Sequence, residues 1–115
     1  MKKNFKFKNF NEKKFLNNKN LFLINCSPIG MKGNRRNLIP FKINIIMKSS
    51  IVMDLVNYPS KTKLIELAKK FNKKIILGSS ISLYQIKYQS EIYLNKTLKI
   101  KFLQNLFKKL TIDLS

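Results

Sequence analysis

The stretch that decides the fold runs from Ile51 to Tyr93 and reads IVMDLVNYPSKTKLIELAKKFNKKIILGSSISLYQIKYQSEIY. An apolar run that ends in an acid (51–54) is followed by a proline-containing turn, and residues 61–71 then carry apolar side chains at helical spacing. A second apolar run (74–77) closes on Gly78 and leads into another helical pattern. This order predicts parallel strands with polar groups at their carboxyl ends, where ligands bind in such sheets.

Upstream of this stretch, the apolar run Leu21–Ile24 is stopped abruptly by the polar and turn residues 25–28. A short, wholly apolar run of this kind is typical of a strand buried on both faces, as in parallel sheets. Residues 31–40 have the composition of a loop, and residues 41–47 fit a short helix that crosses back over the sheet. Three strands that alternate with helices predict an α/β fold with a parallel sheet.

Capping residues and apolar spacing predict where the later helices begin. Ser60 is a plausible N-cap for the helix after the first turn. Ser79 or Ser80 fits the same role for a helix up to Leu94, and a basic amphipathic helix is expected over about 98–110. The chain therefore ends in a pair of helices.

The charge of the chain is strongly basic, with 24 Lys and Arg against five acids and a net charge of +19. Such a balance indicates a nucleic acid or an anionic surface as partner. However, only two of the basic residues are Arg, and lysines are spread along the whole chain together with many Asn, Ile and Phe, all residues with A/T-rich codons. A coding bias is therefore the alternative explanation, since basic binding faces are usually clustered and use Arg.

Several classes of site are excluded by composition. The single cysteine, Cys26, rules out an intramolecular disulfide and a cysteine zinc site, and the absence of histidine removes His-based catalysis and most zinc or iron sites. No apolar run exceeds about five residues, whereas roughly 20 are needed to cross a bilayer. The N-terminus lacks the apolar segment of a signal peptide. We expect no metal, no membrane partner and a cytoplasmic location.

Residues 1–20 form a basic lead-in, in which Phe5 and Phe7 alternate with lysines as in a short edge strand. A solvated lead-in without regular structure is the alternative.

Three segments resemble the shikimate dehydrogenase family. LINCSPIGM (Leu23–Met31) resembles its "IINATPxGM", MDLVNYPSKTKLIELAKK (Met53–Lys70) its "xDxVYNPxxTxLLxxAxx", and ILGSSISLYQIKYQSEIY (Ile76–Tyr93) its "xxGxxMLxxQxxxQFExW". All three occur in the family's order and at its spacing. The resemblance implies that residues 21–115 are the C-terminal half of a Rossmann-like NADP-binding domain. Its partial parallel sheet would have about three strands (21–24, 51–54, 74–77) flanked by helices, with residues 5–10 a possible remnant edge strand.

Members of this family reduce 3-dehydroshikimate to shikimate with NADPH, a step in aromatic amino-acid biosynthesis. By resemblance, the cofactor NADP would be contacted by residues from all three segments: Asn25, Ser27, Leu55, Gly78 and Ile81. Each of these polar or glycine positions is also compatible with an ordinary turn residue.

By resemblance, the substrate, shikimate or 3-dehydroshikimate, would be contacted by Asn57, Tyr58 and Gln85. The neutral amide of Gln85 suits a hydroxyl group. Gln85 is otherwise a surface residue of a polar helix. The family's Tyr-Asn pair is reversed here as Asn57-Tyr58, so either Tyr58 replaces the family's tyrosine or that contact is lost.

The family's catalytic Lys and Asp, and a glycine-rich turn for the pyrophosphate, have no counterpart in these residues. No catalytic residue is therefore assigned, and we expect the isolated chain to be inactive unless an N-terminal half complements it. The choice between NADP and NAD stays open. The alternative function is that of a small basic nucleic-acid-binding protein of the ribosomal type, which would use the last helix and aromatic stacking.

Overall fold

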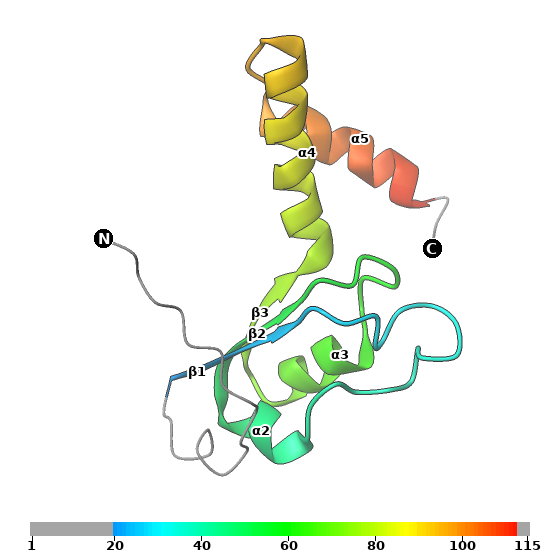
Figure 1. Cartoon of the computed structure of the whole chain (residues 1–115), viewed down its shortest axis with the longest axis vertical. Coiled ribbons are helices and arrows are strands. Elements are labelled where there is room, and N and C mark those ends of the chain that lie inside the picture. Colours follow the sequence, from blue (N-terminus) through cyan, green and yellow to red (C-terminus); the bar gives the residue numbers. More distant parts are fainter. Residues whose placement is uncertain (1–19, 113–115) are drawn as a thin grey trace, which may run out of the picture.

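The computed structural model describes residues 20–112, with side chains as far as Lys109; the possible edge strand at residues 5–10 lies outside this range. These residues contain three strands and four helices, whose arrangement can be followed in Figure 1. In chain order they are β1 (Leu21–Asn25), α2 (Ile43–Lys48), β2 (Ser49–Asp54), α3 (Lys63–Lys70), β3 (Lys74–Leu77), α4 (Gly78–Leu94) and α5 (Ile100–Ile112).

The three strands form one parallel sheet in the order β1-β2-β3. Leu23, Val52 and Ile75 lie in one row across it, and the last row joins Asn25, Asp54 and Leu77. The prediction of an α/β fold with three parallel strands is confirmed. Because all strands run the same way, their carboxyl ends share one edge of the sheet.

One face of the sheet carries the hydrophobic core. Figure 1 shows α2 and α3 on the same side of the strands. Each of the larger core side chains stabilises the fold by about 1.5–3 kcal/mol relative to exposure. Side chains from both strands and both helices make up the core: Leu21, Leu23, Ile45, Ile46, Val52, Leu64 and Ala68.

The opposite face of the sheet is open in the described part of the chain. Side chains alternate along a strand, so Phe22 and Ile24 point away from the core, and they are 45% and 43% exposed. The prediction that the first strand is buried on both faces is therefore wrong for these residues, because α2 and α3 both cover the other side. We call this surface the open face; by register it comprises Phe22, Ile24, Ile51, Met53 and Ile76.

The helix starts differ from the expected ones. Thr62, not Ser60, is the N-cap of α3, and its hydroxyl accepts the N–H of Ile65 at 3.3 Å. Helix α4 begins at Gly78, directly after β3, without a side-chain cap, so neither Ser79 nor Ser80 has the predicted role.

Glu91 on α4 forms a hydrogen bond with the segment that leads into α5. Its carboxylate accepts Lys87 Nζ at 2.6 Å and the backbone N–H of Leu98 at 2.7 Å. The hydrogen bond from Lys87, followed by that from Leu98, lowers the pKa of Glu91. Figure 1 shows α4 rising away from the sheet with α5 beside it. None of the helices within residues 20–112 is both long and apolar enough to cross a membrane.

Candidate functional site

The candidate site lies at the carboxyl ends of the three strands. All predicted contact residues belong to the segments that leave this edge: the loop after β1, the loop after β2, and the first turns of α4. In open parallel sheets, ligands bind outside this edge. The positions of these three segments relative to one another therefore determine the shape of the site.

A buried carboxylate, Asp54, ties two of these segments to α3. Its Oδ1 accepts Asn25 Nδ2 and the backbone N–H of Val56, both at 3.0 Å, and its Oδ2 accepts the hydroxyl of Thr62 at 2.5 Å. Asp54 is 1% exposed, so all of these bonds are shielded from water. The network holds the end of β1, the end of β2 and the start of α3 together.

The loop after β1 is shaped by Asn25. Its Oδ1 accepts the backbone N–H and the hydroxyl of Ser27, at 3.1 and 2.7 Å, and its Nδ2 also donates to the carbonyl of Ile29. Protein groups therefore use both ends of the amide, and Asn25 is buried. Ser27 is half-buried beside it. The predicted cofactor contact of this loop stays a prediction, and Ser27 or the backbone is better placed for it than the Asn25 amide.

The loop after β2 meets the start of α4 at Gly78. A Cβ atom on Gly78 would lie 2.8 Å from the carbonyl carbon and oxygen of Leu55 and from the oxygen of Val56. Only glycine permits this close approach. Leu55 is 39% exposed next to this contact, and Ile81 is half-buried one turn further along α4. Three of the predicted cofactor residues are therefore brought together.

The adjacent residues Asn57 and Tyr58 point to different partners. Asn57 forms two hydrogen bonds with the hydroxyl of Ser82 on α4, at 2.8 and 3.0 Å. The hydroxyl of Tyr58 instead accepts Lys32 Nζ at 3.3 Å, on the loop after β1. The reversed pair thus places an amide, not a phenol, against α4.

Gln85 lies three residues after Ser82, on the same side of α4, and is exposed. Its amide has no hydrogen-bond partner among residues 20–112. Asn57 and Gln85 are therefore both polar groups at the junction of the β2 loop and α4, as predicted substrate contacts should be. Whether they contact a substrate stays a prediction.

Four residues that shape this edge were not among the site residues predicted from the sequence. Asp54 and Thr62 carried a usable signal, because an acid at a strand end followed by a Thr before a helix fits a buried cap. Ser82 and Lys32 carried none, since their partners are 25 and 26 residues away. In the described ranges there is no group of three Cys, Asp or Glu side chains that could hold a metal ion.

Comparison with known proteins confirms the resemblance over part of the chain. No protein-family model matches it. Over 63 residues, 55% of the chain, it is 38% identical to the shikimate dehydrogenase (NADP(+)) of Methanocaldococcus jannaschii, and the match covers 22% of that protein.

Solved structures show the same similarity. A shikimate dehydrogenase in complex with NADP+ matches 73% of the chain with a TM-score of 0.64 and 32% identity. A shikimate 5-dehydrogenase-like protein matches 78% with a TM-score of 0.70 and 27% identity. The chain covers 29% and 34% of these two proteins, so it spans about a third of their length. It is similar to one part of a shikimate dehydrogenase with a Rossmann-like sheet.

Proposed function

We propose that this chain forms the nicotinamide-facing and substrate-facing part of a shikimate dehydrogenase-type oxidoreductase, which reduces 3-dehydroshikimate with NADPH. The observation that carries the proposal is the junction of the β2 loop with α4. There the backbone of Leu55 and Val56 contacts Gly78, and Asn57 is bonded to Ser82. Two of the three segments that resemble the family thus meet at the ligand-binding edge, and Asp54 ties the third to them.

The cofactor would lie with its nicotinamide against Leu55, Gly78 and Ile81. A half-exposed leucine and a half-buried isoleucine beside a glycine offer the flat, apolar surface that suits a nicotinamide ring. The nicotinamide supplies the hydride, and these residues orient the ring and exclude water. Gly30, Gly33 and Gly78 do not have the spacing of a pyrophosphate-binding turn, so these residues fit only the nicotinamide end of the cofactor.

The substrate would be bound at the same junction, through the amide of Gln85. Gln85 offers a free amide to a ring hydroxyl, and Asn57 holds the β2 loop in place beside it. No Lys–Asp pair for the reacting carbonyl is found at this edge in the described residues. That pair would come from further residues of a longer polypeptide or from a second one, since the match covers only 22–34% of the relatives.

One edge of the sheet could pair with such an additional segment or polypeptide. β1 is one of the two edge strands of the sheet that the described residues form, and its sequence LFLIN contains no charged residue. Exposed edge strands are normally protected by charges, proline or a covering element. A strand that pairs with β1 would extend the sheet and cover its free edge.

The exposed single thiol of Cys26 fits a reducing, cytoplasm-like compartment.

The test is reconstitution. The chain is mixed with a polypeptide that carries a glycine-rich turn and a Lys–Asp pair, sought next to its coding region, and NADPH oxidation is measured with 3-dehydroshikimate. We expect turnover only in the mixture. A flat trace from a mixture that forms a stable complex would sink the proposal.

In the reconstituted enzyme, Gln85→Ala should raise the KM for the substrate about three- to tenfold, the value of one neutral hydrogen bond, and leave the KM for NADPH unchanged. Gln89→Ala is the matched control, because Gln89 is an exposed glutamine one turn further along α4. Equal effects of the two substitutions, or a loss confined to NADPH, would contradict the role of Gln85.

A further inference from the structure

The loop after β1 contains a compact unit, residues 28–38, which we call the basic loop. Its backbone is closed by hydrogen bonds from Gly30 N to Arg35 O at 2.9 Å, from Arg36 N to Gly33 O at 3.1 Å and from Leu38 N to Arg35 O at 3.2 Å. Gly30 and Gly33 have φ angles of +93° and +116°, a conformation that favours glycine. The basic loop therefore has a defined shape.

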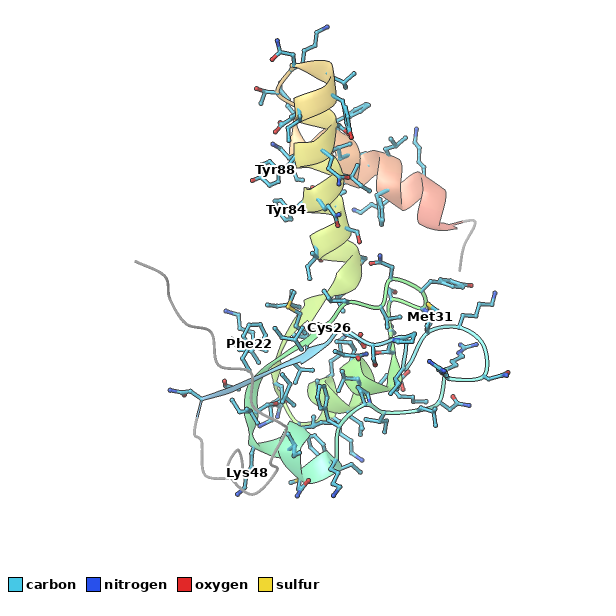
Figure 2. The ribbon with its side chains drawn as sticks, in the orientation of Figure 1. Phe22, Cys26, Met31, Lys48, Tyr84 and Tyr88 are labelled. Atoms are coloured by element: carbon cyan, nitrogen blue, oxygen red, sulfur yellow. The ribbon has the colours of Figure 1, made fainter. Side chains whose placement is uncertain are left out.

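Two further bonds hold the basic loop at the edge of the sheet. The buried Asn25 donates to the carbonyl of Ile29 at 3.0 Å, and the backbone N–H of Lys32 donates to the carbonyl of Tyr58 at 3.1 Å. The backbone of the loop is consequently held in place relative to the strand ends. Figure 2 shows Met31 on this loop, at the opposite end of β1 from Phe22.

Two cationic side chains of this loop, Lys32 and Arg35, contribute to the lining of an open hollow. Pro28, Met31, Lys32, Asn34 and Arg35 line a space of about 240 Å³. The ammonium group of Lys32 is placed by the hydroxyl of Tyr58 and lies 5.0 Å from the centre of its ring.

No cationic side chain of the basic loop forms an ion pair with another described residue. No Asp or Glu occurs between residues 20 and 53. The ion pairs that join residues in the described part of the chain are Lys63–Glu66 and Lys87–Glu91, both remote in sequence from this loop. Lys32 and Arg35 are therefore available to an anion from outside the protein.

We propose that this hollow binds the phosphate group of a small molecule. A phosphate carries a charge of about −1.5 to −2 near neutral pH, which one lysine and one arginine balance. Arginine adds two parallel hydrogen bonds to phosphate oxygens, and the amide of Asn34 adds another donor. The inference goes beyond the proposed function and does not depend on it, because none of the residues there assigned to cofactor or substrate supplies the cations.

The test uses the full chain with an environment-sensitive dye on Cys26, its single, exposed cysteine. Inorganic phosphate and ribose 5-phosphate are titrated separately at constant ionic strength, so that free phosphate and a phosphate monoester are distinguished. Saturable binding of either supports the proposal. The double variant Lys32→Gln/Arg35→Gln should weaken it about tenfold or more. The shifts of the Gly30 and Gly33 amide resonances provide a second readout without the dye.

The matched control is Lys69→Gln/Lys70→Gln, which removes two exposed charges from the last turn of α3 and should change affinity less than about twofold. Equal losses in the two double variants would overturn the proposal, because they would show a response to net charge alone. A dye signal of the same size from chloride at equal ionic strength would also overturn the proposal. Uridine homopolymer RNA that binds far more tightly than phosphate, and loses affinity equally in both variants, would also overturn it.

Discussion

Asp54 connects three segments at the carboxyl edge of the sheet. Its two carboxylate oxygens accept hydrogen bonds from Asn25, Val56 and Thr62, which belong to three different segments. No buried side-chain polar atom in the described residues lacks a partner. Because this network is fully satisfied, the loss of one acceptor leaves a buried donor without a partner.

Asp54→Asn should therefore lower the free energy of unfolding by about 1–3 kcal/mol, since the new NH2 group cannot accept the hydroxyl of Thr62. Urea unfolding followed by circular dichroism measures the change. Glu66→Gln serves as control, because its ion pair with Lys63 is exposed and worth less than about 1 kcal/mol. Equal stability of the two variants would show that the buried network is not maintained in solution.

Gly78→Ala should destabilise the protein by about 1–3 kcal/mol, the usual cost of overpacking. The added Cβ would lie 2.8 Å from backbone atoms of Leu55 and Val56, which cannot rotate away as a side chain can. Ser80→Ala, an exposed substitution in the same turn of α4, is expected to change stability little. Thermal unfolding compares the two. An unchanged Tm for Gly78→Ala would mean that α4 is not packed against the β2 loop as closely as the structure indicates.

Helices α4 and α5 lie outside the main hydrophobic core, and Glu91 makes an acidic contact near the turn between them. Glu91 receives hydrogen bonds from Lys87 and from the backbone of Leu98, and Asn95 makes the turn in the left-handed region with a φ of +49°. Leu83 and Leu103 are the buried side chains of this pair. Figure 2 shows Tyr84 and Tyr88 projecting from the side of α4 away from α5.

The helix pair should loosen at acid pH. Because the pKa of Glu91 is lower in the folded chain than its ordinary value of 4.5, the contact contributes full stability above that pH and loses it as the pH falls below it. Hydrogen exchange of the Leu98 amide, corrected for its intrinsic pH dependence, should therefore accelerate on acidification. In the Glu91→Gln variant, the Leu98 amide should be less protected from exchange at neutral pH. Its protection should also not change over the pH range in which Glu91 is protonated. A wild-type profile that is as flat as that of the variant would contradict the role of Glu91.

In the described part of the molecule, helices cover only one face of the sheet with a hydrophobic core. A well-packed core covers one face of the sheet, whereas the open face and the free edge of β1 meet at the same strand. Phe22 and Ile24 contribute apolar surface beside backbone groups without a strand partner in the described part of the chain. Such a combination favours pairing with another chain or aggregation.

We therefore expect the isolated chain to self-associate. Phe22→Lys should raise the concentration at which it stays monomeric, by about tenfold, because a charge on an edge strand opposes pairing. Met47→Lys adds the same charge to the exposed surface of α2 and should have little effect. Analytical ultracentrifugation compares the variants. A wild-type chain that stays monomeric at every concentration tested would contradict this expectation.

Periodicity and end signals in the sequence were sufficient for the order of strands and helices. β3 has the expected limits, and β1 and β2 extend the expected strands by one and two residues. These features are local: an apolar run or a helical face is set by residues within a few positions of one another. The three motifs likewise identified the family that the chain resembles, because each lies within one continuous segment.

Contacts between distant residues required the folded chain. Thr62 directly precedes α3 and caps it, and its hydroxyl also reaches Asp54. Asn57 and Tyr58 have different partners because Ser82 lies on α4 and Lys32 on the loop after β1. The open face of β1 could not be predicted either, since its composition is that of a buried strand and only the placement of α2 and α3 leaves it uncovered. Local sequence specifies the elements, but the side each element covers depends on which other elements are available to pack against it.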